Sequence, residues 1–274
     1  MNTMLVTDPK INIEKNGFLN IELDPELDLF AEIERLKKEK NAIILAHYYQ
    51  EPDIQDVADY IGDSLGLAQK AEKTDADIIV FAGVHFMAES ADILTSTTQK
   101  VILPDLAAGC SMADMATASQ VQECWKQLSE IGIANKTIPV TYMNSSAAIK
   151  SFTGEHGGTI CTSSNAQKTM EWALTKGSKI LFLPDQHLGR NTAVRDLGMS
   201  LDDCVVWDPH RPSLTAEELR ELLSAVTAAN AKSARATGFS IWTPPAWNRK
   251  VAWSSADRAI FSVETARYRS WWKA

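Results

Sequence analysis

Short, uninterrupted apolar runs that alternate with helix-like segments constrain this fold more than any other feature of the sequence. Such runs are typical of strands that are buried on both faces of a sheet. Strands that alternate with helices predict right-handed βαβ units and parallel sheets. We therefore expect an α/β protein whose strands are residues 42–46, 77–82, 101–103, 138–142, 179–183 and 204–207.

The order of these runs predicts two blocks, at about 28–108 and 109–212, after an N-terminal extension of residues 1–27 and before a tail of residues 213–274. Asp24 followed by Pro25 predicts the start of a helix. Helical spacing of apolar residues also covers 54–61 and 166–176, and a capping box at 215–218 predicts a further helix. Residues 239–274 show no sustained periodicity.

The composition is that of an ordinary globular protein. The 274 residues are 45% hydrophobic and 23% charged, and no run of about 18 apolar residues predicts a membrane span. The N-terminus lacks the pattern of a secretory signal. Four cysteines without regular spacing indicate a reducing compartment rather than a disulfide framework, so we expect a cytoplasmic protein.

The charge of the chain changes sign near residue 230. Residues 231–274 contain 8 Lys and Arg against 2 Asp and Glu, whereas the whole chain has a net charge of −8. Five of the eight tryptophans also lie in this tail. A shift this abrupt marks a boundary. A basic, Trp-rich tail could in principle contact nucleic acid or a membrane, and the alternative is a segment that did not evolve with the rest of the chain.

Cys110 is the leading candidate for chemistry. It lies in the run 104–113, PDLAAGCSMA, directly after the predicted strand 101–103. In α/β proteins, functional side chains gather where strands end. Gly109 and the other small neighbours leave room for a bulky ligand beside the sulfur. An inert, buried thiol is the structural alternative.

Further polar side chains follow other predicted strands. His47 and Tyr49 follow the first strand, Tyr142 and Asn144 end a later one, and Ser64 and Ser163 precede predicted helices. Imidazole and phenol groups can bind carboxylates or move protons, and a hydroxyl at a helix N-terminus can bind an anion. Each residue also has a structural interpretation, as a hydrogen-bonded core side chain, a helix N-cap or a turn residue.

Taken together, these segments resemble the quinolinate synthase family of iron–sulfur enzymes. They occur in the family's order over residues 28–212. The matching segments are 44–50 (ILAHYYQ), 62–64 (GDS), 83–89 (GVHFMAE), 104–113, 140–144 (VTYMN), 161–166 (CTSSNA) and 182–190 (FLPDQHLGR).

The resemblance implies a fold of three similar three-layer αβα units around a pseudo-threefold axis, of which two are evident here. It implies a cytoplasmic, C–C bond-forming transferase that condenses iminoaspartate with dihydroxyacetone phosphate to give quinolinate for NAD biosynthesis. It places Cys110 as one of three thiolates on a [4Fe–4S] cluster, whose open iron acts as a Lewis acid. It assigns substrate binding to His47, Ser64, Tyr142, Asn144 and Ser163, and catalysis to Tyr49 and Tyr142.

The sequence departs from the family pattern after about residue 213. No cysteine follows Cys204, so the family's second and third cluster ligands have no counterpart. We interpret Cys124 as a core residue within a helix, Cys161 as the start of a serine-containing turn, and Cys204 as part of a buried strand. In the run 185–190, His187 and Arg190 have the spacing of one helix face and are interpreted as structural.

Two hypotheses follow. The chain is a quinolinate synthase with small anionic substrates, and an enzyme that supplies iminoaspartate is its candidate protein partner. Alternatively, the chain is a catalytically incomplete family member whose third unit was lost by truncation or a shifted reading frame. Neither hypothesis involves nucleic acid or a membrane, and the basic-tail binding module is the weakest interpretation.

Overall fold

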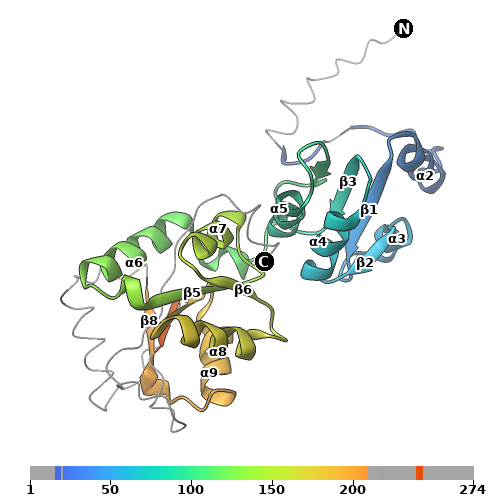
Figure 1. Ribbon diagram of the computed structural model, residues 1–274. Coiled ribbons are helices and arrows are strands. Elements are labelled where there is room, and N and C mark those ends of the chain that lie inside the picture. The colour runs from blue at the N-terminus through green and yellow to red at the C-terminus, as the bar shows by residue number, and fades with distance from the viewer. Residues whose placement is uncertain (1–15, 20, 209–216, 218–238, 243–274) are drawn as a thin grey trace. The chain divides into compact units, whose positions relative to one another are not determined.

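The computed structural model describes residues 16–19, 21–208, 217 and 239–242 of the chain. The chain divides into two compact units, Met1–Cys110 and Ser111–Ala274. Each unit is a sheet of mainly parallel strands flanked by helices, as the sequence predicts (Figure 1). Among the described residues, no helix combines the length and the apolar character that a membrane-spanning helix requires.

The first unit contains a four-stranded parallel sheet with the strand order β2-β1-β3-β4. Helices α4 and α5 pack against each other on one side of the sheet, and α2 and α3 lie on the other side (Figure 1). The elements are β1 Ala42–His47, β2 Tyr60–Gly62, β3 Ile78–Ala82, β4 Lys100–Ile102, α2 Leu29–Glu39, α3 Pro52–Asp56, α4 Ser64–Lys73 and α5 His85–Leu94.

The second unit contains a five-stranded sheet with the order β6-β5-β7-β9-β8. Helices α6 and α7 cover one face, and α8 and α9 cover the other (Figure 1). The elements are β5 Thr137–Tyr142, β6 Thr159–Cys161, β7 Lys179–Leu183, β8 Cys204–Trp207, β9 Phe239–Trp242, α6 Ala118–Glu130, α7 Ala147–Glu155, α8 Ala166–Lys176, α9 Gln186–Arg195 and the 3₁₀ turns η1 Ala113–Met115, η2 Ala134–Lys136 and η3 Leu201–Asp203.

The two sheets repeat one topology. In each unit the first strand is central, the second strand lies at the edge beside it, and the third strand pairs on its other side. The sequence carries no visible internal repeat, so this similarity emerges only from the pairing of the strands. β9 is the difference between the units, because it lies between β7 and β8 and is antiparallel to both. It falls in a stretch where the sequence predicted no regular element.

Two helix predictions need correction. Asp24 does not begin a helix, because its carboxylate accepts a hydrogen bond from the backbone N–H of Glu26 in a turn, and α2 starts after the N-cap Asp28. The helical spacing over 54–61 is also misleading. Helix α3 ends at Asp56, and Ile61 belongs to the edge strand β2. Of the helix predicted from Thr215, the structure describes only Glu217, which is helical.

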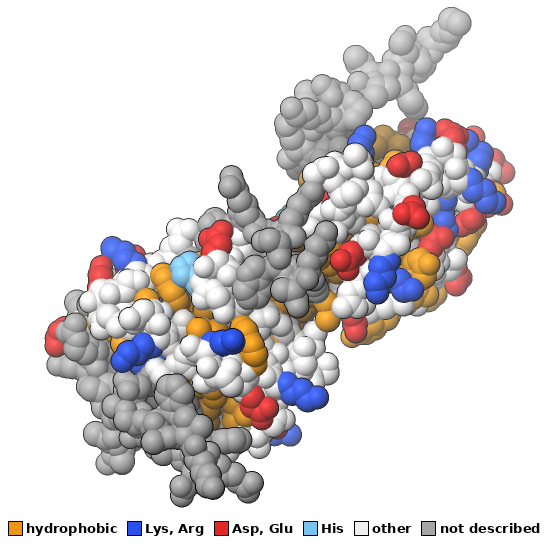
Figure 2. Space-filling view, in the orientation of Figure 1, with side chains coloured by type: hydrophobic (Ala, Val, Ile, Leu, Met, Phe, Trp, Pro, Cys, Tyr) orange, Lys and Arg blue, Asp and Glu red, His pale blue; other side chains and the backbone are white. Residues whose placement is uncertain are grey.

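Helix α2 lies on the surface of the first unit. None of its residues is buried, and Leu29 and Phe30 of its predicted apolar face are each 48% exposed. Arg35 pairs with Glu32 and Glu39 along the helix, and Figure 2 shows charged side chains of both signs crowded over α2. Such exposed pairs stabilise a helix only modestly. The helix is therefore held by its local charge pattern and by contact with β1.

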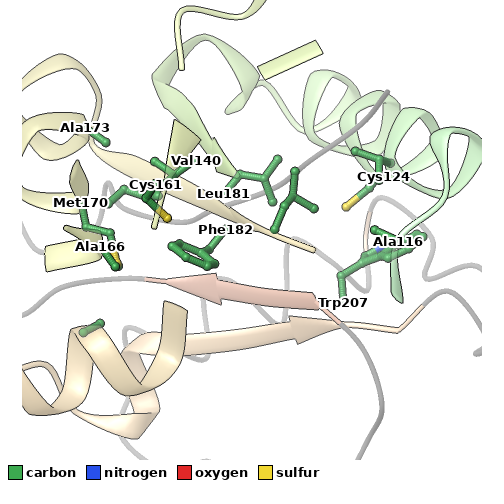
Figure 3. Close-up of a cluster of buried hydrophobic side chains, with 14 of the residues drawn as sticks. Ala116, Cys124, Val140, Cys161, Ala166, Met170, Ala173, Leu181, Phe182 and Trp207 are labelled. Atoms are coloured by element: carbon green, nitrogen blue, oxygen red, sulfur yellow. The ribbon is translucent and has the colours of Figure 1, made fainter. Parts of the chain in front are cut away.

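The core of the second unit forms around β7, whose five residues are all buried. Phe182 and Leu181 of this strand are at most 1% exposed, and α6, α8 and β8 pack side chains around them (Figure 3). The indole N–H of Trp207 donates to Gln127 Oε1 at 3.0 Å, so β8 is tied to α6 by a buried hydrogen bond. The cis peptide bond between Leu183 and Pro184 follows directly after β7.

Gly158 allows β6 to approach β5 closely. A Cβ atom at this position would lie 1.8 Å from the carbonyl oxygen of Pro139, which is a backbone atom of β5 and cannot move without disturbing the pairing. The approach matters for the site, because β6 ends just before the loop that carries Ser163.

We predict that Gly158→Ala lowers the free energy of unfolding of the second unit by about 3 kcal/mol or more, because overpacking against backbone forces strain. The matched control is Gly132→Ala, where φ is +74° but no atom lies within 4 Å of the added Cβ. It should cost only about 1 kcal/mol. Urea unfolding followed by tryptophan fluorescence measures both, since all eight tryptophans lie in the second unit. Equal losses in the two variants would contradict the prediction.

Candidate functional site

Polar side chains of the first unit gather at the carboxyl edge of its sheet. His47 ends β1 and pairs in register with Gly62, the last residue of β2. Ser64 opens α4 immediately beyond that strand, and Tyr49 lies two residues past His47. Three of the residues predicted from the sequence therefore lie at one edge of one sheet.

His47 is buried between two tyrosines. Its ring centroid lies 3.9 Å from that of Tyr49 and 4.2 Å from that of Tyr48. Burial lowers the pKa of His47, and the nearby carboxylate of Asp63 opposes this effect only in part. The ring is therefore neutral near pH 7. Its Nδ1 accepts from the backbone N–H of Tyr49 at 3.4 Å, which places the ring proton on Nε2.

Ser64 is not the N-cap of α4. Asp63 takes that role, with its Oδ1 accepting from the backbone N–H of Gly66 at 2.7 Å. Ser64 becomes the first residue of the helix, is only 8% exposed, and makes no side-chain hydrogen bond to another described residue. The structural interpretation of this serine is therefore wrong, and its hydroxyl stays available at a helix N-terminus.

Tyr49 connects this edge to Cys110. Burial raises the pKa of the Tyr49 phenol, and so do the thiol of Cys110 and the neighbouring Tyr48. The hydroxyl lies 4.0 Å from the sulfur of Met87 in α5. Cys110 itself is a free, partly exposed thiol. Tyr49 and Cys110 are thus close enough to interact electrostatically within the first unit.

The second unit has a similar edge. Tyr142 ends β5 and pairs in register with Cys161, which ends β6, while the preceding Thr141 pairs with Leu183 at the end of β7. Asn144 and Ser163 lie in the segments that follow β5 and β6. The predicted residues of this unit therefore lie at the carboxyl ends of neighbouring parallel strands.

Most polar groups in the loops at this edge form hydrogen bonds with one another, and two side chains form none with a described residue. Thr141 donates to Ser145 Oγ at 3.0 Å, and Ser145 donates to the carbonyl of Tyr142 at 2.8 Å. In the next loop, Asn165 Oδ1 accepts from the backbone N–H and the hydroxyl of Thr162. The side chains of Asn144 and Ser163 make no hydrogen bond to another described residue.

Asp185 is a site candidate that the sequence did not single out. It follows β7 and caps α9, with Oδ1 accepting from the backbone N–H groups of His187 and Leu188. Its Oδ2 is buried and has no hydrogen-bond partner among the described residues. Its position after a buried strand is the signal that would have identified it. His187 and Arg190 do share one helix face, with side-chain nitrogens 3.5 Å apart.

The three cysteines of the second unit lie in different surroundings. Cys124 and Cys161 are each 1% exposed, and Figure 3 shows their sulfurs on the α6 side and the α8 side of the hydrophobic cluster. Cys204 opens β8 but is partly exposed rather than buried, and its thiol donates to the carbonyl of Ser200. Among the residues that the structure describes, no group of three or more His, Cys, Asp or Glu side chains could hold a metal ion.

Comparison with known proteins identifies the family. A family model described as NadA, quinolinate synthetase A protein, matches residues 31–230, which is well over half of the chain. The chain belongs to the quinolinate synthetase A family. It is 61% identical over 212 residues to quinolinate synthase of Streptomyces coelicolor, and 55% identical over 222 residues to that of a Nocardioides species. Quinolinate synthase of Bacillus subtilis is 54% identical over 193 residues.

The chain spans about half the length of these relatives. The matched part is 76% of this chain but 54% of the Streptomyces protein, and 69% of this chain but 52% of the Bacillus protein. The family match continues past residue 213 to residue 230, and it ends where the charge of the sequence changes sign. The composition boundary and the end of the family match therefore coincide.

The four thiols should differ sharply in reactivity. Burial raises the pKa of Cys124 and of Cys161, and the carboxylate of Asp185 raises that of Cys161 further. We predict that iodoacetamide modifies Cys110 and Cys204 at least about tenfold faster than Cys124 and Cys161 in the folded chain, because only accessible thiolates react. Peptide mass spectrometry measures each site, and denaturation in urea should remove the difference. Early modification of Cys161 in folded protein would contradict the structure.

The protonation of His47 provides a second test. We predict that His47 titrates below the ordinary histidine value of 6.5 in an NMR experiment. Asp63→Asn should lower this pKa further, because it removes a charge that stabilises the imidazolium, while asparagine still caps α4. His47→Gln assigns the resonance. A pKa above 6.5, or an increase in the Asp63→Asn variant, would show that the surroundings of the ring are described wrongly.

Proposed function

We propose that this chain is a quinolinate synthase, which condenses iminoaspartate with dihydroxyacetone phosphate to give quinolinate in the cytoplasm; the alternative is a family member that is catalytically incomplete. Family membership and identities of 54–61% to proteins named quinolinate synthase support the reaction class. The match to about half of those proteins makes the completeness of the site the open issue.

One observation supports the proposal most strongly. Three of the side chains expected to bind substrate, those of Ser64, Asn144 and Ser163, make no hydrogen bond to another described residue, whereas neighbouring polar groups are engaged. Among the described residues, Ser64 has no side-chain partner because Asp63 caps α4, and Ser163 has none because Thr162, Ser164 and Asn165 bond to one another. Polar side chains left without a partner in this way are available to a ligand.

In the first unit, we assign anion binding to His47 and Ser64. The Nε2–H of a neutral His47 can donate to a substrate carboxylate without the cost of burying a charged ring. The hydroxyl of Ser64 donates at the N-terminus of α4, where the helix dipole favours negative charge. Tyr49 is assigned to catalysis, because its raised pKa keeps the phenol protonated and able to donate to a developing oxyanion.

In the second unit, we assign substrate binding to Tyr142, Asn144 and Ser163. The Asn144 amide can hold a carboxylate and orient an imine, and the Ser163 hydroxyl adds a further anion contact. Tyr142 is assigned to both binding and catalysis. The buried, unpartnered Oδ2 of Asp185 can accept an N–H of a nitrogen-containing substrate at the same edge. Since the chain is acidic overall, these local donors must attract the anionic substrates.

Cys110 is the one described residue that we assign to an iron–sulfur cluster. Its thiol is partly exposed and lies near Tyr49, which suits a ligand at the rim of a site. A [4Fe–4S] cluster is held by three or four thiolates, and the other cysteines are buried in the second unit or engaged with Ser200. The described residues therefore fit one ligand and not a complete set, so no step of the reaction is assigned to a cluster on this chain.

The incomplete ligand set favours the alternative function, a family member that is catalytically incomplete as a 274-residue chain. The basic, Trp-rich segment 231–274 contains no cysteine and no histidine, so it offers no replacement ligand. An incomplete site also admits water, which weakens every electrostatic contact within it. Apolar surface left uncovered would promote self-association.

We predict that this chain, purified and reconstituted anaerobically with iron and sulfide, forms quinolinate at least about a hundredfold more slowly than the Bacillus enzyme, because misplaced or missing groups are costly in catalysis. Turnover with both substrates, measured as quinolinate formed, provides the test. Comparable rates would overturn the prediction and would mean that Cys124, Cys161 or Cys204 had been recruited as ligands.

The matched variants are Cys110→Ser and Cys204→Ser. If any cluster forms, Cys110→Ser should abolish the charge-transfer absorption and the bound iron, whereas Cys204→Ser should leave both unchanged. Unchanged absorption in Cys110→Ser would rule out the cluster assignment of this residue, whatever the activity.

A further inference from the structure

The loop that leads to Cys110 is attached to a segment far earlier in the chain. The backbone N–H of Leu106 donates to the carbonyl of Gly17 at 2.8 Å. The neighbouring residues Phe18 and Asp105 form an isolated antiparallel bridge. Gly17 and Phe18, which belong to the extension expected from the sequence, therefore pair with the backbone of the Cys110 loop.

Gly17 makes this contact possible. Its φ is +81°, a conformation that side-chain-bearing residues rarely adopt. An added Cβ would lie 3.2 Å from the Cβ of Ala107 and 3.3 Å from Asp105 Oδ1, which is tighter than ordinary van der Waals contact. Both the backbone conformation and the close approach therefore favour glycine at this position.

The loop is also held from its other side. Asp105 Oδ1 accepts from the backbone N–H of Ala107 at 2.8 Å, and the Asp105 carbonyl accepts from Ala108 at 3.2 Å. The carbonyl of Ala108 then accepts from the backbone N–H of His85, the first residue of α5, at 2.8 Å. A tight turn is thus fixed between Gly17 and α5, and Cys110 follows two residues later.

These contacts bury little apolar surface. Phe18 is 43% exposed and Leu106 is 52% exposed. Because apolar burial is the main source of stability, the pairing contributes little to the stability of the unit.

We propose that Gly17 and Phe18 act as a positioning strap, which fixes the turn 105–108 and thereby sets where the Cys110 thiol is presented. The proposal rests on the proposed function in one respect, because presenting this thiol matters for a cluster. The strap itself is a property of the metal-free chain and can be tested without a cluster.

The test uses the full chain with Gly17→Ala and Gly17→Val. The control is Gly132→Ala, at a glycine whose φ is also positive, +74°, but with no atom within 4 Å of the new Cβ. Hydrogen exchange at the Leu106 amide should rise about fivefold or more in the Gly17 variants, the factor that a penalty on the order of 1 kcal/mol gives. The Gly132 variant should not change it. Circular dichroism should show that all three variants remain folded.

The second readout is the rate at which iodoacetamide modifies Cys110 in metal-free protein, with Cys204 of the same molecule as internal reference. The Gly17 variants should change the Cys110 rate about threefold or more and leave the Cys204 rate unaltered, because only the first thiol depends on the strap. Gly17→Val should have the larger effect. Unchanged Leu106 exchange and unchanged Cys110 reactivity in both Gly17 variants would overturn the proposal.

Reconstitution separates this proposal from the proposed function. If the parent chain binds no iron but the Gly17 variants change Cys110 reactivity, the strap is supported and the cluster assignment fails. If the parent binds iron through Cys110 and the Gly17 variants bind it equally well with unaltered thiol reactivity, the cluster assignment stands and the strap is rejected.

Discussion

The parallel pairing of strands is the constraint on which the candidate site depends. Parallel strands end at the same edge of a sheet, so residues distant in sequence are brought together when their strands pair in register. His47 meets Gly62 in this way, and Tyr142 meets Cys161. The polar segments that follow paired strands therefore lie at the same edge of the sheet. The hydrogen bonds within each loop then determine which polar side chains are already paired and which remain available to a ligand.

The same polar residues at the strand ends can therefore be interpreted either as helix caps and turn residues or as ligand-binding groups. A serine before a helix normally caps it. Here Asp63 and Asn165 accept the structural hydrogen bonds of their loops, and Ser64 and Ser163 make no side-chain hydrogen bond to another described residue. A side chain with no internal partner at a strand end is a more specific indicator of a binding site than the residue type alone.

Buried runs made the fold largely predictable from the sequence. Residues 179–183 and 204–207 are strands and 166–176 is a helix, at the bounds that the apolar pattern predicts, because burial on both faces leaves a continuous signal. Short edge strands were missed, since Tyr60–Gly62 and Thr159–Cys161 have only three residues each and carry little pattern. Asp24 does not begin a helix because an aspartate before proline suits a turn as well as a helix.

The residues of the candidate site are predicted by the order of the sequence segments that carry them. The Oδ2 atom of Asp185, which has no hydrogen-bond partner among the described residues, depends on three-dimensional burial that no local sequence pattern encodes.

The position of β9 has a consequence for the order in which the units can form during synthesis. Every described strand of the first unit lies within residues 42–102, so this four-stranded sheet can form as soon as that stretch leaves the ribosome. In the second unit, β8 joins β7 only through β9, which is made later, at 239–242. Domains generally fold as they emerge, and distant pairing is slow. Until residues 239–242 have been synthesised, the far edge of β7 lacks its partner strand. Exposed strand edges of this kind can pair with other chains or bind chaperones.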